Sequence, residues 1–429
     1  MSQDFWRLPK GVDELLPPRA RHLELLRRQV LDLFDVWGYD YIEPPIVEYL
    51  DALLVGNDLK LQTLQVADQV SGRTLGVRAD ITSQAARIDA NSLADEDGRN
   101  GHTRRLCYAG PVVRANPQGV LDSRVPLKAG AEIYGCSGQE ADLEIMCLAI
   151  DALHTAGVRG VVIELGHVGF VRHLVDALTL SEILRKQLFE AVRIKSEADI
   201  RAIFDKALEQ STETPAPDYR YAADRLCRLV CLMGGDVALE SARKLFGATT
   251  ESGAGDLLDE KLLELVSQLD YCAARLRELR SDVLVRFDLS APVGFGYHHA
   301  LVFALYDPGH GRAVARGGRY DGIGEQFGDA RPATGFDLNL KTLLSLDAVT
   351  TGIDKRSNSD SVWVSFGASQ ESGDAKHAKH AKHLEELDAV IVRLREAGVR
   401  VVQALNEEDL RPADCGRELK HTAQGWQPV

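Results

Sequence analysis

Apolar and polar residues alternate with a period of two along the stretch from Leu106 to Gly135, LCYAGPVVRANPQGVLDSRVPLKAGAEIYG. The alternation predicts two half-buried strands, and the Pro and Gly residues between them predict a wide connecting loop. The side chains that share one face are Tyr108, Gly110, Val112 and Arg114 on the first strand, then Lys128, Gly130, Glu132 and Tyr134 on the second.

Opposite charges flank a glycine on the second of these strands, with Lys128 on one side of Gly130 and Glu132 on the other. A residue without a side chain leaves open space above a sheet, so this pattern predicts a site for a small zwitterion. The alternative is a solvated ladder of salt bridges among Arg114, Lys128 and Glu132 on an exposed sheet face.

The order of helical and strand-like patterns predicts an α+β fold with an interrupted core. In its first piece the patterns predict a strand at YDYIEPPIVE (39–48), a hairpin of the runs 63–70 and 73–78 around Ser71-Gly72, and a helix at 137–157. Residues 168–281 are mostly helical, with breaks at TPAPD, MGGD and ESGAGD, and strand-like residues resume at Val283. The predicted parts are a core in two pieces, 1–167 and 282–350, a helical insertion, 168–281, and a short C-terminal α/β segment, 360–429. A chain of 429 residues is long enough for two or three domains.

Charge and cysteine usage narrow the class of protein. The formal net charge is −14 and no clear basic face is visible, so we expect no nucleic-acid partner. Seven scattered cysteines without a CxxC pair indicate a reducing compartment and no metal site. The N-terminus lacks an apolar signal core and no run approaches membrane-spanning length, so we expect a cytoplasmic protein without membrane contact.

Three elements resemble motifs of histidyl-tRNA synthetases. GPVVR followed by PQG and AGAEIYG resembles their motif 2, RADIT resembles RPEGT, and ARGGRYDG resembles GGRYDGL. The resemblance covers roughly residues 1–345. It implies a class II aminoacyl-tRNA synthetase-like antiparallel sheet flanked by helices. The amphipathic helix and strand of 23–48 resemble motif 1, which forms a dimer interface in that class.

The resemblance also implies a histidine pocket. Its proposed members are Asp80 and Thr82 for the ammonium, Glu132 for the ammonium or the imidazole, Tyr297 and His298 for the ring, Lys128, and the motif arginine Arg114. Lys128 replaces a glutamine of the family, and it either reaches the ligand carboxylate or pairs with Glu132. The structural alternatives are that Asp80 caps the helix predicted for 81–90 and that the adjacent His298 and His299 form a half-exposed surface pair.

Other positions depart from the synthetase pattern. Asn116 stands where the family holds adenine with an acid, Asp122 where it has an arginine for the ATP phosphates, and Thr342 where motif 3 ends in an arginine. The aligned run GFDLNLKTL replaces GFAMGLERL, with Lys341 before Thr342. Arg286 is separated from Tyr297 by extra residues and receives no role. Aminoacylation needs fixed positive charge on the transferring phosphates, and this chain has lost much of it.

The C-terminus is too short for the anticodon-binding domain of the synthetases. Strands at 361–367 and 399–404 around a helix at 384–397 are predicted, and the repeat AKHAKHAKH resembles a low-complexity spacer. The spacing of its histidines drifts around a helix, which argues against metal binding.

The chain combines a synthetase-like core and a retained histidine pocket with replaced ATP-binding residues. In this combination it resembles the regulatory subunits of ATP phosphoribosyltransferase in histidine biosynthesis. The resemblance implies no complete active site and no cofactor. It also implies a separate short-form catalytic subunit as partner, feedback inhibition by L-histidine, and a hetero-octamer built on dimers of this chain. The alternatives are a functional histidyl-tRNA synthetase and a free-standing histidine-binding sensor.

Overall fold

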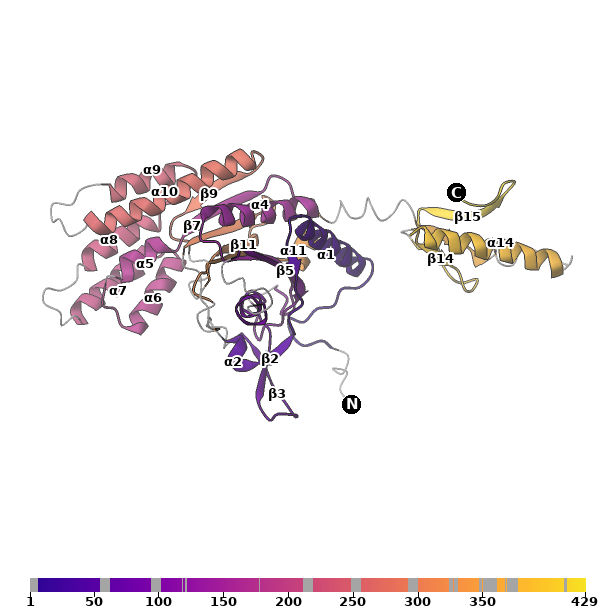
Figure 1. The fold of residues 1–429 in the computed structure, drawn as a ribbon, viewed down its shortest axis with the longest axis horizontal. Helices are drawn as coiled ribbons and strands as arrows, with labels where there is room; N and C mark the ends of the chain where they lie inside the picture. Colours follow the sequence, from indigo (N-terminus) through magenta and orange to yellow (C-terminus); the bar gives the residue numbers. More distant parts are fainter. Residues whose placement is uncertain are drawn as a thin grey trace. The chain divides into compact units, whose positions relative to one another are not determined.

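The structure is a computed structural model (Figure 1). The residues that it describes are 7–54, 62–93, 102–117, 119, 122–176, 178–210, 219–247, 256–291, 300–323, 327, 331–346, 349, 361–366, 368, 377–412 and 415–429. They form two compact units, Met1–Leu346 and Asp347–Val429, each with strands and helices. The predicted α+β class is confirmed.

A nine-stranded sheet runs through the described part of the first unit, in the order β1-β5-β6-β12-β11-β10-β7-β9-β8. The strands are β1 (Asp40–Tyr41), β5 (Arg104–Pro111), β6 (Leu127–Tyr134), β7 (Val162–His167), β8 (Met233–Gly234), β9 (Leu284–Asp288), β10 (Leu301–Tyr306), β11 (Ala313–Arg319) and β12 (Ala333–Asn339). Pairing is antiparallel from β5 through β7 and between β9 and β8, whereas β1 joins β5 and β9 joins β7 in parallel. The class II synthetase-like sheet is therefore present.

The two predicted strands, β5 and β6, pair as the period-two pattern requires. Tyr108 faces Gly130, Gly110 faces Lys128, and Leu106 faces Glu132. Residues directly opposite each other in an antiparallel pair put their side chains on one face. The predicted shared face is confirmed in register.

Long helices cover the opposite face of this sheet (Figure 1). Helix α1 (Arg19–Val36) buries Leu26, Val30 and Phe34, and α4 (Gln139–Ala156) begins after Gly138 with acidic residues in its first turn. A carboxylate near a helix N-terminus is stabilised by the helix dipole. Helix α4 ends at Gly157, whose φ of 101° is the left-handed conformation that glycine adopts most easily.

The block between β7 and β9 is helical apart from β8. It comprises α5 (Gly169–Asp176), α6 (Glu182–Arg193), α7 (Glu197–Gln210), α8 (Tyr219–Leu229), α9 (Val237–Phe246) and α10 (Asp256–Leu279). Helix α10 returns to the sheet and packs on α4, α5 and β7. The side chain of Lys195, between α6 and α7, donates hydrogen bonds from Nζ to both carboxylate oxygens of Asp288 (2.8 and 2.9 Å) and to Ser290 Oγ (2.8 Å). This contact links the insertion to the end of β9.

A small sheet and a short helix lie between β1 and β5. The predicted hairpin is confirmed as β3 (Leu64–Ala67) and β4 (Thr74–Val77), joined in the order β2-β4-β3 with β2 (Val47–Tyr49) and followed by α3 (Thr82–Arg87) and a π-helical turn (Ile88–Ser92). The single strand predicted for YDYIEPPIVE is wrong, because it divides into β1 and β2. Pro44 and Pro45 lie between them, and proline has no N–H to give to a ladder. Short helices α2 (Leu50–Leu53) and α11 (Leu340–Leu344) complete the described elements of this unit.

The second unit has a four-stranded sheet in the order β14-β13-β15-β16 with one helix. Its elements are β13 (Val362–Val364), α14 (His377–Glu396), β14 (Val401–Gln403), β15 (Arg417–Thr422) and β16 (Gly425–Pro428). Leu387 and Ile391 of α14 pack against Val362, Val364 and Trp426. The predicted spacer is partly wrong, because the helix already begins at His377, inside the AKHAKHAKH repeat. Alanine and lysine favour helix, so the repeat extends the predicted helix.

None of the described helices has both the length and the apolar character needed to cross a bilayer.

Candidate functional site

Glu132, on β6, lies at the centre of a buried hydrogen-bond network on the sheet face that α1 and α4 leave uncovered. Its side chain is 1% exposed. Tyr108 donates from its hydroxyl to Glu132 Oε1 (2.9 Å), and Tyr320, just after β11, donates to Oε2. Burial raises the pKa of Glu132 to about 8, and the hydroxyl donors only partly oppose this effect.

Two glycines allow these side chains to lie flat on the sheet. A Cβ at Gly130 would lie 2.6 Å from the hydroxyl oxygen of Tyr108, and a Cβ at Gly335 of β12 would overlap the Glu132 carboxylate. The open space predicted above Gly130 is therefore wrong, because the tyrosine ring from the facing strand covers it. The exposed salt-bridge ladder is wrong as well, since Glu132 is sealed from water.

Asp80 and Thr82 connect β4 to α3 beside this network. Thr82 is 7% exposed and its Oγ1 lies 3.3 Å from the Tyr108 hydroxyl. Asp80 Oδ1 accepts hydrogen bonds from the backbone N–H groups of Ile81 (2.6 Å) and Thr82 (3.3 Å). The capping alternative for Asp80 is wrong as predicted, because Ile81 is the N-cap residue of α3, and the Asp80 carboxylate instead binds the turn that precedes the helix. Burial raises the pKa of Asp80, Asp337 raises it further, and Lys128 opposes both.

Lys128 pairs with Asp337 on β12, the strand next to β6. The two side chains are 13% and 21% exposed. A pairing of Lys128 with Glu132, one of the two predicted outcomes, is wrong, because Asp337 on the neighbouring strand takes the ammonium group.

Arg114 follows β5, and its backbone forms an isolated bridge with Thr63 at the start of the β3 hairpin. Its N–H donates to the carbonyl of Arg124 (2.8 Å), and its side chain is half-buried. Tyr297 and His298, the predicted ring-contacting residues, lie outside the described residues.

Charged residues continue from this network across the sheet. The strand register places one row of residues side by side: Tyr108, Gly130, Asp337, Arg316, Ala304, Glu164 and Arg286. Arg286 and Arg316 are exposed. Glu164 accepts a hydrogen bond from Tyr306 (3.2 Å), and burial raises its pKa. The structure therefore puts Arg286, which received no role from the sequence, on the same face as the predicted pocket.

The positions that depart from the synthetase pattern are engaged in other contacts. Asp122 accepts a hydrogen bond from Arg312 Nη1 (2.7 Å). Thr342 accepts from Asn339 Nδ2 (2.9 Å), and Lys341 Nζ contacts Asp13 (3.1 Å). The Arg312 and Lys341 cations are thus paired with carboxylates of the same chain. Neither offers a triphosphate the unpaired positive charge that adenylate chemistry requires.

Sequence reasoning missed two members of the network and the partner of Lys128. Tyr108 was assigned to the correct face without a role, Tyr320 lies in ARGGRYDG, and Asp337, which pairs with Lys128, is the one charged residue of GFDLNL. An isolated charged residue in a strand that is buried on both faces usually has a partner, so the sequence could have indicated a role for Asp337. The contact between Tyr108 and Glu132 had no such signal, because side-chain period does not reveal a rotamer.

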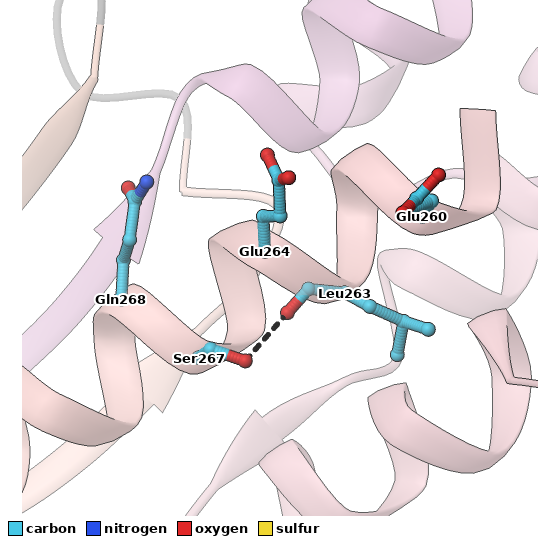
Figure 2. Close-up of a pocket in the computed structure, with 5 residues that line it drawn as sticks. All are labelled: Glu260, Leu263, Glu264, Ser267 and Gln268. Atoms are coloured by element: carbon cyan, nitrogen blue, oxygen red, sulfur yellow. Dashed lines mark hydrogen bonds between the residues drawn. The ribbon is translucent and has the colours of Figure 1, made fainter. Parts of the chain in front are cut away.

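Two hollows lie away from this face. One, of about 450 Å³, runs along α10 and is lined by Glu260, Leu263, Glu264, Ser267 and Gln268, with Ser267 Oγ bonded to the Leu263 carbonyl (Figure 2). The other, of about 140 Å³, lies at Asp142, His167, Cys272 and Arg319 on the helix-covered side. Among the described residues no cluster of three or more His, Cys, Asp or Glu side chains could hold a metal ion.

Comparisons with known proteins give matches along most of the chain. The histidyl-tRNA synthetase family model matches residues 11–343, and the model described as ATP phosphoribosyltransferase subunit HisZ C-terminal domain matches residues 378–429. The ATP phosphoribosyltransferase regulatory subunit of Pseudomonas fluorescens is 40% identical over 430 residues, which is 99% of this chain and 98% of the relative. That of Chromohalobacter salexigens is also 40% identical, over 428 residues, with the same coverage.

The chain belongs to the family of ATP phosphoribosyltransferase regulatory subunits. As a member of this family it is a regulatory and not a catalytic subunit, as the sequence predicts.

Solved structures support the same family. A protein from Bacillus halodurans C, described as an ATP phosphoribosyltransferase regulatory subunit/histidyl-tRNA synthetase, matches with a TM-score of 0.73 and 26% identity over 96% of each chain. The histidyl-tRNA synthetase of Nostoc sp. PCC 7120 matches with a TM-score of 0.68 and 18% identity over 94% of this chain and 87% of that one, which shows the shared fold alone. The regulatory-subunit family therefore keeps the synthetase fold.

Proposed function

We propose that this chain activates a short-form ATP phosphoribosyltransferase catalytic subunit and makes the complex sensitive to feedback inhibition by L-histidine. The observation that carries the proposal is the enclosed network of Glu132, Tyr108, Tyr320 and Thr82. It lies where the synthetase resemblance puts histidine, in a chain whose ATP-binding positions differ from those of the synthetases. A pocket maintained without adenylate chemistry suits a regulatory ligand.

The proposed histidine-binding residues combine charges and rings. They are Asp80, Thr82, Arg114, Lys128, Glu132, Tyr297 and His298. Asp80 and Lys128 are partly exposed, whereas Glu132 lies beneath two tyrosines and supports the floor of the pocket.

Regulation by histidine then follows from linkage. Histidine shifts the complex toward an inhibited arrangement only if it binds that arrangement more tightly than the active one. The proposed assembly is a hetero-octamer in which dimers of this chain hold the catalytic subunits.

Reconstitution tests this function. The chain is co-purified with a short-form catalytic subunit, and phosphoribosyl transfer to ATP is measured with and without the chain and against L-histidine concentration. We expect activation on adding the chain, and inhibition by histidine only when the chain is present. A catalytic subunit that does not co-purify would support the free-standing sensor instead.

Histidine-dependent exchange of pyrophosphate into ATP tests the remaining alternative. The chain alone should give no exchange above a no-enzyme blank, because Asn116, Asp122 and Thr342 replace residues that the synthetases use on ATP. Clear exchange would instead indicate a functional histidyl-tRNA synthetase.

A further inference from the structure

The single ammonium group of Lys128 lies close to two carboxyl groups on the pocket face, and a third, that of Glu132, lies further along β6. Lys128 contacts Asp337, and Asp80 lies close enough for both to shift its pKa. Glu132, the third acid, is 1% exposed and already accepts hydrogen bonds from two tyrosines. The acids that a ligand can reach without displacing a tyrosine are therefore Asp80 and Asp337, and the cation is Lys128.

We propose that the Lys128–Asp337 ion pair is the receptor for the head group of the bound α-amino acid, with Asp337 contacting its ammonium and Lys128 its carboxylate. The proposal rests on the proposed function, because it takes histidine as the ligand of this face. It assigns a binding role to Asp337, which no motif singled out.

Charge complementarity supports this assignment. The head group of an α-amino acid carries one ammonium and one carboxylate, which are complementary to Asp337 and Lys128. On binding, the ion pair between Lys128 and Asp337 is replaced by two ion pairs with the ligand. Asp80 adds a second carboxylate beside a single lysine. This excess of negative charge is relieved by an incoming ammonium group. Because both members of the pair are partly buried, at 13% and 21% exposure, water screens the new contacts only weakly.

The sheet register supports the assignment as well. Asp337 is directly opposite Gly130, and Lys128 is directly opposite Asn339, so both charged side chains rise from the same face as Glu132. The synthetase motif has alanine at the position of Asp337 and the family has glutamine at that of Lys128. This chain thus builds an ion pair from two positions that are neutral in the synthetases, which suits a direct electrostatic role.

The test measures binding of three ligands to the full chain by calorimetry. L-Histidine carries both head-group charges, L-histidinol lacks the carboxylate, and imidazolepropionate lacks the ammonium. The variants are Asp337→Asn, Lys128→Met and the double variant. Asp122→Asn serves as a matched control, because it loses an ion pair with Arg312 whose members are 34% and 60% exposed, outside the proposed receptor.

Each single variant should lose affinity only for ligands that carry the charged group that the replaced side chain contacts. Asp337→Asn should weaken L-histidine and L-histidinol by roughly 10- to 100-fold and imidazolepropionate by less than about 3-fold, since a charge-assisted hydrogen bond is lost in the first two cases only. Lys128→Met should weaken L-histidine and imidazolepropionate and spare L-histidinol. Asp122→Asn should bind all three ligands as the wild type does.

The double variant guards against a purely structural effect. It removes both charges, so it relieves the unpaired charge that either single variant leaves buried, and its thermal unfolding should approach that of the wild type. L-Histidine binding should nevertheless stay weak. Recovery of binding in the double variant, or an equal loss for all three ligands in the single variants, would overturn the receptor role. If the wild type fails to bind L-histidine at all, the proposed function fails as well.

Discussion

Glu132 shows how a single residue couples the fold to pH. In the unfolded chain a glutamate has a pKa of 4.5, whereas burial raises that of Glu132 to about 8 in the folded chain. Between these pH values the folded chain holds a proton that the unfolded chain has released. The contribution of Glu132 to the free energy of unfolding therefore falls as pH rises from about 4.5 to 8 and stops falling above 8.

Glu132→Gln should remove this dependence, because glutamine resembles the protonated acid and does not titrate. Relative to the wild type, the variant should gain up to about 1.4 kcal/mol of unfolding free energy per pH unit between pH 5 and 8. Urea titrations at pH 5.5 and 8.0 measure the difference. Glu190→Gln changes an exposed glutamate and is the control, which should keep the pH dependence of the wild type. Parallel pH dependences for wild type and Glu132→Gln would contradict the raised pKa.

The sequence indicated some residues of the network and not others for a physical reason. Alternation placed Glu132 and Tyr108 on one face, because a strand fixes the direction of every second side chain. It did not show that Tyr108 lies over Gly130, which depends on a rotamer. It also did not pair Lys128 with Asp337, because 209 residues separate the two and strand order is set by the whole fold.

Among the elements, the contact of Lys195 with the end of β9 ties the helical insertion to the sheet. Lys195 has a φ of 56°, a left-handed conformation that costs a non-glycine residue energy and that its three hydrogen bonds offset. Asp288, its partner, has a side chain that is 8% exposed. Without the lysine this buried carboxylate would keep the hydrogen bonds from Ser290 but would have lost the cation that balances its charge.

Lys195→Met should therefore destabilise the first unit by about 3 kcal/mol, the usual cost of removing one partner of a buried pair. Hydrogen exchange should become faster in 284–290 and at the junction of α6 and α7. Lys186→Met is the matched control, because its pair with Glu182 is 68% and 81% exposed and should contribute less than about 0.5 kcal/mol. Equal stability of the two variants would show that the link carries little energy.

Elements with a strong local signal were predicted well. The hairpin around Ser71-Gly72 and helix α4, with its acidic start and Gly157 end, follow from turn and capping chemistry. Elements that depend on the tertiary fold were not predicted well. A local pattern cannot show that Pro44-Pro45 divides one predicted strand into two strands that belong to different sheets. The division into core, insertion and C-terminal segment stays a proposal.

At the scale of the whole molecule, the segment that resembles motif 1 presents apolar side chains to solvent in the single chain. Tyr41, Ile46 and Val47 are 46%, 47% and 42% exposed. Exposed apolar side chains gathered in one segment mark a surface that another chain covers. Two-fold association is the commonest oligomeric state, which agrees with the dimer that the resemblance implies.

The chain should therefore sediment as a dimer at micromolar concentration, and the double variant Tyr41→Lys/Val47→Lys should sediment as a monomer. Buried lysines without partners oppose association strongly. Val70 lies at a hairpin tip and is 96% exposed, so Val70→Lys should leave the dimer intact. A wild-type monomer, or a dimer that survives the double substitution, would count against this interface.

The two glycines beneath the network also limit how such a pocket can diversify in evolution. Alanine at position 335 would collide with the Glu132 carboxylate, and alanine at 130 with the Tyr108 hydroxyl. A single mutation at either position would therefore disrupt the hydrogen-bond network whatever its effect on ligand specificity. Lys128 and Asp337 are on the same sheet face, and in the proposed pocket they carry the contacts to the ligand head group. A lineage that changes its effector would then keep glycine at 130 and 335 while 128 and 337 change together, so new specificities arise from the rim of an inherited pocket.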